Sequence, residues 1–240
     1  MKLLQKYQEE LKPWRSASPL PDFFLSLLGE YGPQHWWPGD SPFETAIGAI
    51  LTQNTSWTNV EKAIANLRHA NMLDAASMNG VDAGFLEEFI RPSGYFRQKS
   101  KKLKTFCTFL AERYDGEIGN LKEIPLCQAR EELLSIKGIG PETADSILLY
   151  ALEFPIFVVD AYTVRIVDRW FNREAGTWTY DELQTYFMDR LPHSAELFNE
   201  YHALLVRFAK ESCTKREPGC CECFLIRDCK YGEMSLTSEK

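Results

Sequence analysis

Five of the seven cysteines lie between Cys213 and Cys229, and no other feature limits the possible folds of this chain so strongly. Four of them, Cys213, Cys220, Cys223 and Cys229, have the spacing C-x6-C-x2-C-x5-C. A compact loop with four thiolates can enclose a tetrahedral zinc ion or a cubane iron–sulfur cluster. Zinc ribbons usually show two C-x2-C pairs, whereas this loop has one, so the spacing alone leaves zinc and iron–sulfur open.

The composition is that of a folded protein. Hydrophobic residues make up 45% of the 240 residues and charged residues 25%, which excludes disordered and fibrous classes. No apolar run approaches the roughly 18 residues of a membrane span, and no secretory signal is visible, so we expect reduced thiols. The net charge of -7 argues against a nonspecific nucleic-acid coat protein but is compatible with a local basic face.

The periodicity of the apolar residues predicts an all-α fold. The segments Glu61 to Leu67, Glu131 to Leu134 and Asp181 to Leu191 have helical spacing and good helix formers. Only the run Phe154 to Val159 looks like a strand, and because helical segments flank it, we interpret it as a buried connector. The coarse prediction is a helical protein with a metal-bearing loop near its C-terminus.

The segment Leu133 to Leu152, LLSIKGIGPETADSILLYAL, predicts two helices joined by a tight glycine turn. Pro141 suits the first position of the second helix, and Gly138 and Gly140 can leave backbone N–H groups bare. Bare N–H groups beside a helix N-terminus can hold a phosphate oxygen. The plain alternative is an ordinary helix–turn–helix corner, and the motif alone does not decide between the two.

Asp160 follows the apolar connector and stands where the N-cap of the next helix is expected. Val164 and Val167 lie on the apolar face of that helix. Capping alone would account for an aspartate here, at about 1 kcal/mol. The functional alternative is a carboxylate held at the edge of a cleft.

Together these motifs resemble the helix–hairpin–helix (HhH-GPD) DNA glycosylases of the endonuclease III group. The resemblance rests on Ile136 to Gly140 (IKGIG), on Val158-Val159-Asp160 and on the four-cysteine loop. The segments Leu51 to Thr55 (LTQNT) and Gly94 to Lys99 (GYFRQK) resemble the glutamine-bearing loop and the G-x-Y-x-x-K segment of that family.

The resemblance implies a six-helix barrel over residues 36–150 and a cluster domain built from residues 1–35 and 151–240. The loop 213–229 would then hold a [4Fe-4S] cluster, and the cleft between the domains would be the active site. The implied activity is base excision repair, in which a damaged base is flipped out of double-stranded DNA and its N-glycosidic bond is cut. We further expect a monomer without membrane contact, either cytoplasmic at a prokaryotic nucleoid or of unknown location.

One departure from the family predicts the subclass. Bifunctional members carry a lysine two residues after the second hairpin glycine, and that lysine forms a Schiff base with the sugar. Here the position is Glu142, which cannot form an imine, so we expect a monofunctional enzyme. Trp36-Trp37-Pro38, Phe43 and Tyr162 resemble the 3-methyladenine branch, whose similar members can lack the cluster.

The resemblance implies roles for individual residues. Asp160 would be the catalytic carboxylate that stabilises an oxocarbenium-like sugar and orients water. The expected base pocket consists of Trp36, Trp37, Phe43, Glu142 and Tyr162. Gln53 is expected to fill the space that the flipped nucleotide leaves in the duplex. The other expected DNA contacts are Lys99, Lys137, Gly138, Ile139 and Gly140.

The segment Arg97 to Lys104 holds five positive and no negative charges, so the rest of the chain sums to -7 minus 5, or -12. Such segregation suits a DNA face, although a solvated helix surface would look the same. Two alternative functions remain at this stage. One is a related glycosylase for an oxidised, deaminated or mismatched base, and the other is a noncatalytic protein that binds DNA damage.

Overall fold

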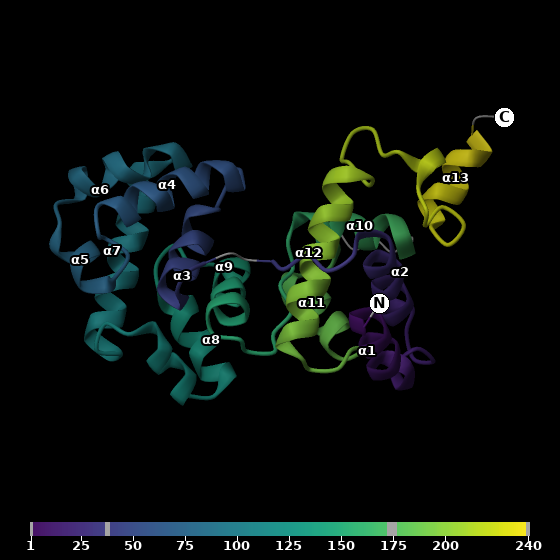
Figure 1. The fold of residues 1–240 in the computed structure, drawn as a ribbon, viewed down its shortest axis with the longest axis horizontal. Helices are drawn as coiled ribbons and strands as arrows, with labels where there is room; N and C mark the ends of the chain where they lie inside the picture. The colour runs from purple at the N-terminus through teal and green to yellow at the C-terminus, as the bar shows by residue number, and fades with distance from the viewer. Residues whose placement is uncertain (1, 37–38, 172–176, 239–240) are drawn as a thin grey trace. The chain divides into compact units, whose positions relative to one another are not determined.

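The computed structural model describes residues 2–36, 39–171 and 177–238, and no strand occurs among them. This confirms the predicted all-α class (Figure 1). The chain forms two compact units, one of residues 37–154 and one of residues 1–36 with 155–240. Within the described ranges, no helix is both long and apolar enough to cross a membrane.

The unit of residues 37–154 is organised around a buried helix. Its helices are α3 (Pro42–Leu51), α4 (Trp57–His69), α5 (Ala75–Gly80), α6 (Ala83–Ile90), α7 (Phe96–Arg113), α8 (Leu126–Ser135) and α9 (Pro141–Ser146). Helix α3 begins because the Ser41 hydroxyl accepts the Glu44 N–H at 3.1 Å and Pro42 occupies the first turn. Every residue from Phe43 to Leu51 is buried, so α3 is the centre of this unit.

Short irregular helices connect these elements. A 3₁₀ turn, Arg91–Ser93, precedes α7, and another, Ile118–Glu123, precedes α8. The helix after the glycine turn departs from the predicted α-periodicity, because Ile147–Ala151 forms a π-helical turn in which the Leu152 N–H donates to the Ile147 carbonyl at 3.2 Å. The wider turn still buries Ile147, Leu148 and Ala151, and it packs against α3.

The other unit contains both ends of the chain. Its helices are α1 (Lys2–Leu11), α2 (Leu20–Tyr31), α10 (Ala161–Phe171), α11 (Tyr180–Met188), α12 (Ala195–Glu211) and α13 (Lys230–Ser238). The core is aromatic: Phe157 stacks on Phe187 with ring centroids 4.2 Å apart, and Tyr201 of α12 donates its hydroxyl to the Leu20 carbonyl. Because Phe157 belongs to the connector predicted to be buried, that prediction is confirmed.

Helix boundaries follow local chemistry. The predicted helices at 61–67 and 131–134 lie inside α4 and α8. The third predicted helix ends early, at Met188 rather than at Leu191. Pro192 disfavours helical geometry at the residue before it, and the chain closes with a turn in which the Arg190 N–H donates to Phe187.

Candidate functional site

Asp160 lies at the N-terminus of α10 with a side chain that is 12% exposed. Its Oδ1 atom accepts the Thr163 N–H at 2.7 Å and the Thr163 hydroxyl at 2.9 Å. The capping role predicted for Asp160 is therefore present and uses one of the two carboxylate oxygens. The second oxygen, Oδ2, takes no part in the cap.

His202 of α12 lies beside this second oxygen. Its Nε2 atom is 3.5 Å from Asp160 Oδ2, and its side chain is 7% exposed. Burial by itself raises the pKa of Asp160, but the charge and hydrogen bond of His202 and the bonds from Thr163 outweigh it, so the net pKa lies below the ordinary value. Asp160 is thus ionised at neutral pH. Sequence reasoning missed His202, because no motif links it to a residue 42 positions earlier.

Two of the aromatic residues predicted for the base pocket, Trp36 and Tyr162, lie near the same lysine ammonium group. Lys210 Nζ lies 6.0 Å from the ring centroid of Trp36 and 6.0 Å from that of Tyr162. Arg165 also lies over the Tyr162 ring, at 5.2 Å. Both rings are partly exposed and belong to the unit that carries Asp160. The third predicted aromatic residue, Trp37, lies outside the described residues.

Phe43 does not fit the predicted role in a base pocket. Its side chain is buried in α3 and stacks on Phe106 of α7, with ring centroids 6.4 Å apart. The pairing is a core contact between two helices. The sequence pattern could not separate a stacking platform from a core ring, because both need a large aromatic residue.

The glycine turn has the shape expected of a backbone-binding corner. Gly138 has a φ of +96°, a conformation that glycine adopts at little cost. Ile139 is buried and anchors the turn, while Lys137, Gly138 and Gly140 are exposed. Glu142 is also exposed, in the first turn of α9.

Gln53 is hydrogen-bonded to this turn. Its Nε2 atom donates to the Gly138 carbonyl at 3.2 Å and to the Thr143 hydroxyl at 2.9 Å. Lys102 of α7 donates its ammonium to Gln53 Oε1. The residue predicted to fill the vacated space and the predicted glycine turn are therefore joined in one network, together with a lysine that the sequence analysis did not single out.

Lys99 lies in the interior instead of on a DNA face. It is 2% exposed, and its ammonium donates to the Leu51 carbonyl at 2.9 Å and the Ser93 carbonyl at 2.7 Å. Burial, and then the charge of Lys102, lower its pKa to about 8. These bonds fasten the end of α3 to the turn before α7 and leave the ammonium no route to a phosphate. Next to this turn, Tyr95 is 66% exposed with a φ of +46°, an unusual conformation that the sequence did not signal.

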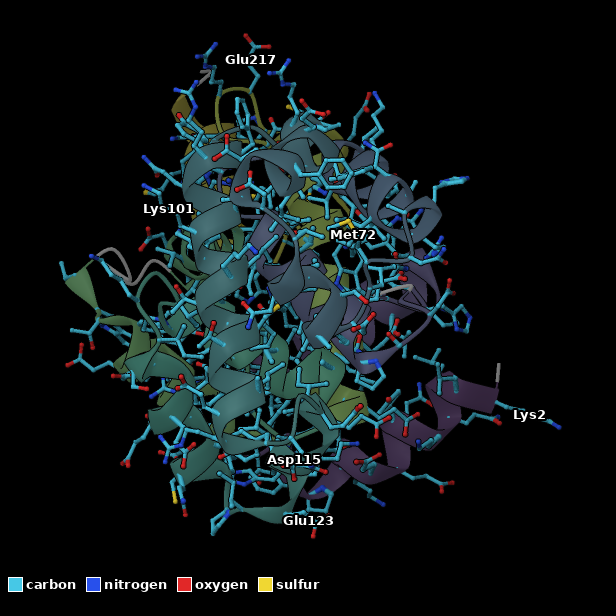
Figure 2. All side chains as sticks on the ribbon, turned by 90° about the vertical axis from the view of Figure 1, so that its left-hand side faces the viewer. Lys2, Met72, Lys101, Asp115, Glu123 and Glu217 are labelled. Atoms are coloured by element: carbon cyan, nitrogen blue, oxygen red, sulfur yellow. The ribbon has the colours of Figure 1, made fainter. Side chains whose placement is uncertain are left out.

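The charge run at 97–104 is only partly a surface feature. Besides Lys99 and Lys102, Lys104 is engaged, because its ammonium donates to the carbonyls of Asn79 and Val81. Arg97 is 81% exposed, and Lys101 lies at the outer surface (Figure 2). Three of the five cations therefore hold the unit together, so the charge run is neither a set of five free cations nor a fully solvated helix surface.

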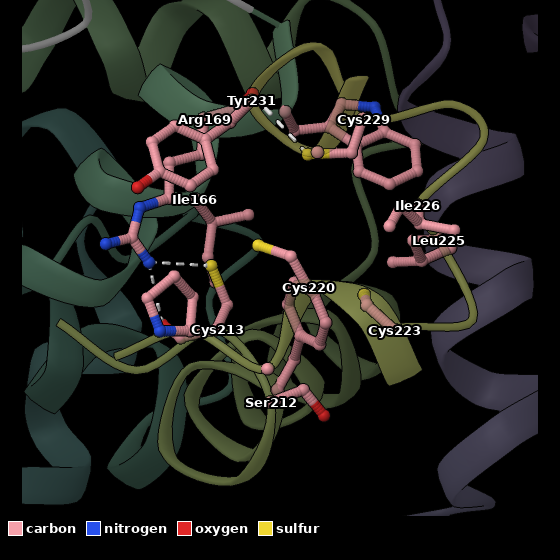
Figure 3. Close-up of a pocket in the computed structure, with 15 residues that line it drawn as sticks. Ile166, Arg169, Ser212, Cys213, Cys220, Cys223, Leu225, Ile226, Cys229 and Tyr231 are labelled. Carbon is pink, nitrogen blue, oxygen red and sulfur yellow. Dashed lines mark hydrogen bonds between the residues drawn. The ribbon is translucent and has the colours of Figure 1, made fainter. Parts of the chain in front are cut away.

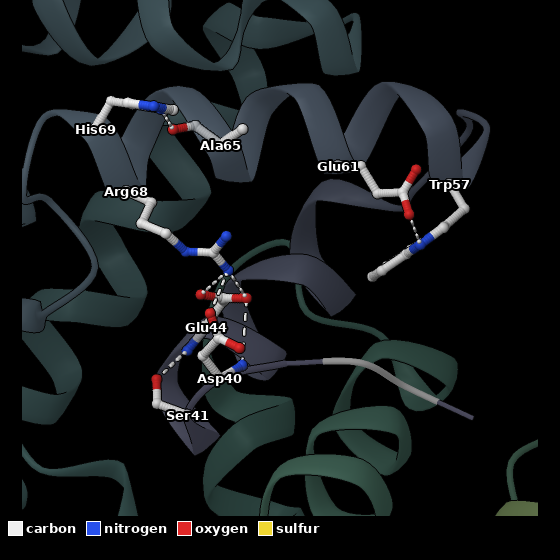
Figure 4. A network of polar contacts seen from close by, with 8 residues as sticks. All are labelled: Asp40, Ser41, Glu44, Trp57, Glu61, Ala65, Arg68 and His69. Atoms are coloured by element: carbon white, nitrogen blue, oxygen red, sulfur yellow. Dashed lines mark hydrogen bonds and ion pairs between the residues drawn. The ribbon is translucent and has the colours of Figure 1, made fainter. Parts of the chain in front are cut away.

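An acidic cavity in the unit of residues 37–154 was not predicted from the sequence. It has a volume of about 290 Å³ and is lined by Gly39, Asp40, Glu44, Gly48, Trp57, Glu61, Ile64 and Arg68. Figure 4 shows the polar side chains Asp40, Glu44, Trp57, Glu61 and Arg68 of this lining. Arg68 donates to both oxygens of Glu44, at 2.7 and 2.8 Å, and pairs with Asp40 at 2.8 Å. Two carboxylates thus face one guanidinium, and the third carboxylate of the lining, Glu61, accepts the Trp57 indole N–H at 2.9 Å.

The four predicted metal ligands line a single pocket. Cys213, Cys220, Cys223 and Cys229 surround it together with apolar residues such as Ile166 and Leu225 (Figure 3). Burial and the neighbouring thiols raise the pKa of Cys223 and of Cys229. No group of three or more described His, Cys, Asp or Glu side chains converges as a single-ion site would require. The donor set, four thiols in apolar surroundings, fits an iron–sulfur cluster chemically.

Two arginines of α10 hold the cysteine loop. Arg169 donates to the Cys213 sulfur at 3.2 Å and to the Thr214 carbonyl at 2.7 Å, and it stacks on Tyr231. Arg165 donates to the Cys213 carbonyl at 3.1 Å. Helix α10 therefore carries Asp160 at its start and fastens the thiol loop further along.

Comparison with known proteins identifies the family. The sequence profile of the HhH-GPD superfamily of base excision DNA repair proteins matches residues 47–193, which include the glycine turn and Asp160. The chain belongs to this superfamily. The match and the all-helical architecture confirm the predicted fold class and the resemblance to endonuclease III-type DNA glycosylases.

Individual relatives agree with this assignment. A candidate DNA repair glycosylase of Methanocaldococcus jannaschii is 46% identical over 197 residues, covering 79% of this chain and 86% of the relative. The H. pylori 3-methyladenine DNA glycosylase MagIII, bound to 1,N6-ethenoadenine, has a TM-score of 0.68 at 31% identity and covers 85% of this chain and 97% of that one. A noncovalent endonuclease III–DNA complex has a TM-score of 0.76 at 22% identity, covering 89% of this chain and 95% of that one; it shows the shared fold.

Proposed function

We propose that this HhH-GPD glycosylase is monofunctional and releases alkylated purines of the 3-methyladenine type from double-stranded DNA. The observation that carries the proposal is the carboxylate of Asp160, held ionised at the N-terminus of α10. The absence of the Schiff-base lysine, whose position is taken by Glu142, supports the monofunctional part. The 31% identity to the H. pylori enzyme supports the choice of base.

The chemistry follows from the charge of the substrate. Alkylation at N3 or N7 makes the purine cationic, so the N-glycosidic electron pair leaves with the base without prior protonation. Water then bonds to the anomeric carbon and loses its proton to solvent. Asp160 would stabilise the positive charge that develops on the sugar, which an ionised carboxylate does better than a neutral acid.

The acidic cavity suits a cationic base. Its three carboxylates and single guanidinium leave excess negative charge, and the Trp57 indole offers an aromatic face. A cation over an aromatic ring gains about 0.5–2 kcal/mol. We propose Trp57 as a contributor to base recognition in place of Phe43. Trp36, Glu142 and Tyr162 remain proposed members of the base pocket.

We propose that the DNA backbone binds at the glycine turn. Gly138 and Gly140 are exposed, and their N–H groups can donate hydrogen bonds to a phosphate oxygen, while Lys137 adds a nearby cation. Gln53 would fill the space left by the flipped nucleotide, and the exposed Tyr95 ring can stack between bases. Contacts of this type position the duplex without reading its sequence.

We propose that Cys213, Cys220, Cys223 and Cys229 hold a [4Fe-4S] cluster. When bound, the cluster would supply a rigid link between four points of the loop. The chain's own contribution is the pair Arg165 and Arg169, which fix the loop to α10 through backbone carbonyls and the Cys213 sulfur.

The deciding experiment is an excision assay on duplexes that differ in a single base. The panel contains 3-methyladenine, 7-methylguanine, an oxidised pyrimidine, uracil and a mismatched thymine, and half the samples receive no strand-cleaving treatment. We expect release of the alkylated purines, intact strands without treatment, and no covalent complex after borohydride. Release confined to oxidised pyrimidine with spontaneous strand cleavage would contradict both parts of the proposal.

Matched variants connect the assay to the residues. Asp160→Asn should lose base release and retain DNA affinity, whereas a noncatalytic damage-binding protein would lose nothing. Trp57→Ala should weaken excision of alkylated purines far more than binding to undamaged duplex. Trp178→Ala, which removes a tryptophan of the other unit, is the control for general loss of stability.

A further inference from the structure

We propose that His202 is a positioning residue for Asp160, which holds the carboxylate in the ionised and oriented form that base release needs. This inference rests on the proposed catalytic role of Asp160. It assigns a role to a buried side chain of α12 that no sequence motif marks.

The two oxygens of Asp160 are held from two different helices. Oδ1 accepts two hydrogen bonds from Thr163, on the same helix as Asp160, at 2.7 and 2.9 Å. Oδ2 lies 3.5 Å from His202 Nε2, on α12. Helices α10 and α12 pack against each other, so this pairing is set by the tertiary fold. Oδ1 is thus fixed by hydrogen bonds within α10, and Oδ2 faces the imidazole of α12.

The protonation state of Asp160 depends on this arrangement. The side chain is only 12% exposed, and burial favours the neutral acid. Of the groups that lower the pKa of Asp160, His202 contributes most, and the Thr163 N–H and hydroxyl contribute as uncharged donors. Without His202 the pKa of the carboxyl would move up toward the value that burial imposes. A protonated carboxyl group cannot stabilise a positive sugar electrostatically.

An imidazole suits this task for two reasons. Its side chain is compact enough to be 7% exposed, where an arginine or lysine would need more space. When protonated it supplies a positive charge, and when neutral its Nε2–H tautomer still donates a hydrogen bond.

The test is the pH profile of single-turnover base release from a duplex with one alkylated purine. The variant His202→Phe removes the charge and the donor, and His202→Gln retains an N–H donor without the charge. We expect the acid limb of the profile to move to higher pH by about one unit or more in the phenylalanine variant. That shift lowers the rate at a given pH on the limb about tenfold per unit. The glutamine variant should shift less.

A merely structural role would lower the rate at every pH and leave the limb in place, and this result would overturn the proposal. His193→Phe is the matched control, because His193 is an exposed histidine of the same unit; its limb should not move. If the phenylalanine variant fails to fold, as judged by circular dichroism, the glutamine variant decides by the same criterion.

A double variant separates this inference from the proposed function. If His202 acts through Asp160, adding His202→Phe to Asp160→Asn should leave the residual rate unchanged; a further loss of tenfold or more would show that His202 acts elsewhere. If Asp160→Asn alone releases the base at the parental rate, the proposed function of Asp160 fails. If Asp160→Asn is inactive and the limb of the His202 variants stays fixed, only the present inference fails.

Discussion

Replacing Gly138 by alanine perturbs the network that joins the glycine turn to Gln53. Gly138 has a φ of +96°, and a Cβ atom built there would lie 2.8 Å from Cε and 2.9 Å from Cγ of Lys102. The backbone would thus be strained, and the Lys102 side chain would have to move. Since Lys102 donates to Gln53, the glutamine would lose one of its anchors.

The loss of stability in Gly138→Ala comes from the strained backbone and from the displaced Lys102 side chain. Holding an L-residue in a left-handed conformation costs about 1–2 kcal/mol. Because the Lys102 side chain is flexible, its displacement adds little strain of its own. For a chain of this length, about 1 kcal/mol corresponds to about 2–4 °C in Tm. We therefore expect Gly138→Ala to lower the Tm by about 2–8 °C.

Gly140 provides a matched control within the same turn. Its φ of -96° is open to any residue, and no heavy atom lies within 4 Å of a Cβ built there. Gly140→Ala should therefore leave the free energy of unfolding unchanged or raise it by up to about 1 kcal/mol, so that its Tm is equal to or above the parental Tm. Thermal denaturation followed by circular dichroism measures both variants. Equal melting temperatures for the two variants would refute the reasoning on Gly138.

Two further predictions concern Lys99 and the thiol pocket. Lys99→Met leaves the carbonyls of Leu51 and Ser93 without their donor and should cost about 1–3 kcal/mol in denaturant unfolding. The pKa of Lys99 is lowered from 10.5 to about 8 in the folded state, so between pH 8 and pH 10.5 the unfolded chain binds more protons than the folded one. The free energy of unfolding of the parent should therefore rise with pH in this range. Lys99→Met should not show this rise. For the thiol pocket, the purified protein should be yellow-brown with broad visible absorbance. Cys220→Ala should lose this colour, and Cys221→Ala should keep it. A colourless parent protein with stoichiometric zinc would contradict the cluster.

The local features of the site were open to prediction because they depend on residues near one another in the chain. The glycine turn, the capping aspartate and the cysteine spacing each need only a short segment with the right residue types. The same holds for the buried connector around Phe157, because its continuous apolar run predicts burial without any information on distant contacts. The π-helical turn at Ile147–Ala151 was missed, because its apolar stripe is shared with an ordinary α-helix.

The sequence by itself determined the helical class, the turn at Gly138 and the placement of Asp160 at a helix start. The tertiary structure alone decided which lysines of α7 face inward, that Phe43 packs into the core, and that His202 meets Asp160. The physical reason is the range of the forces involved. Turns and caps are settled by sterics and hydrogen bonds within a few residues, whereas burial and ion pairing depend on which distant segments the fold brings into contact.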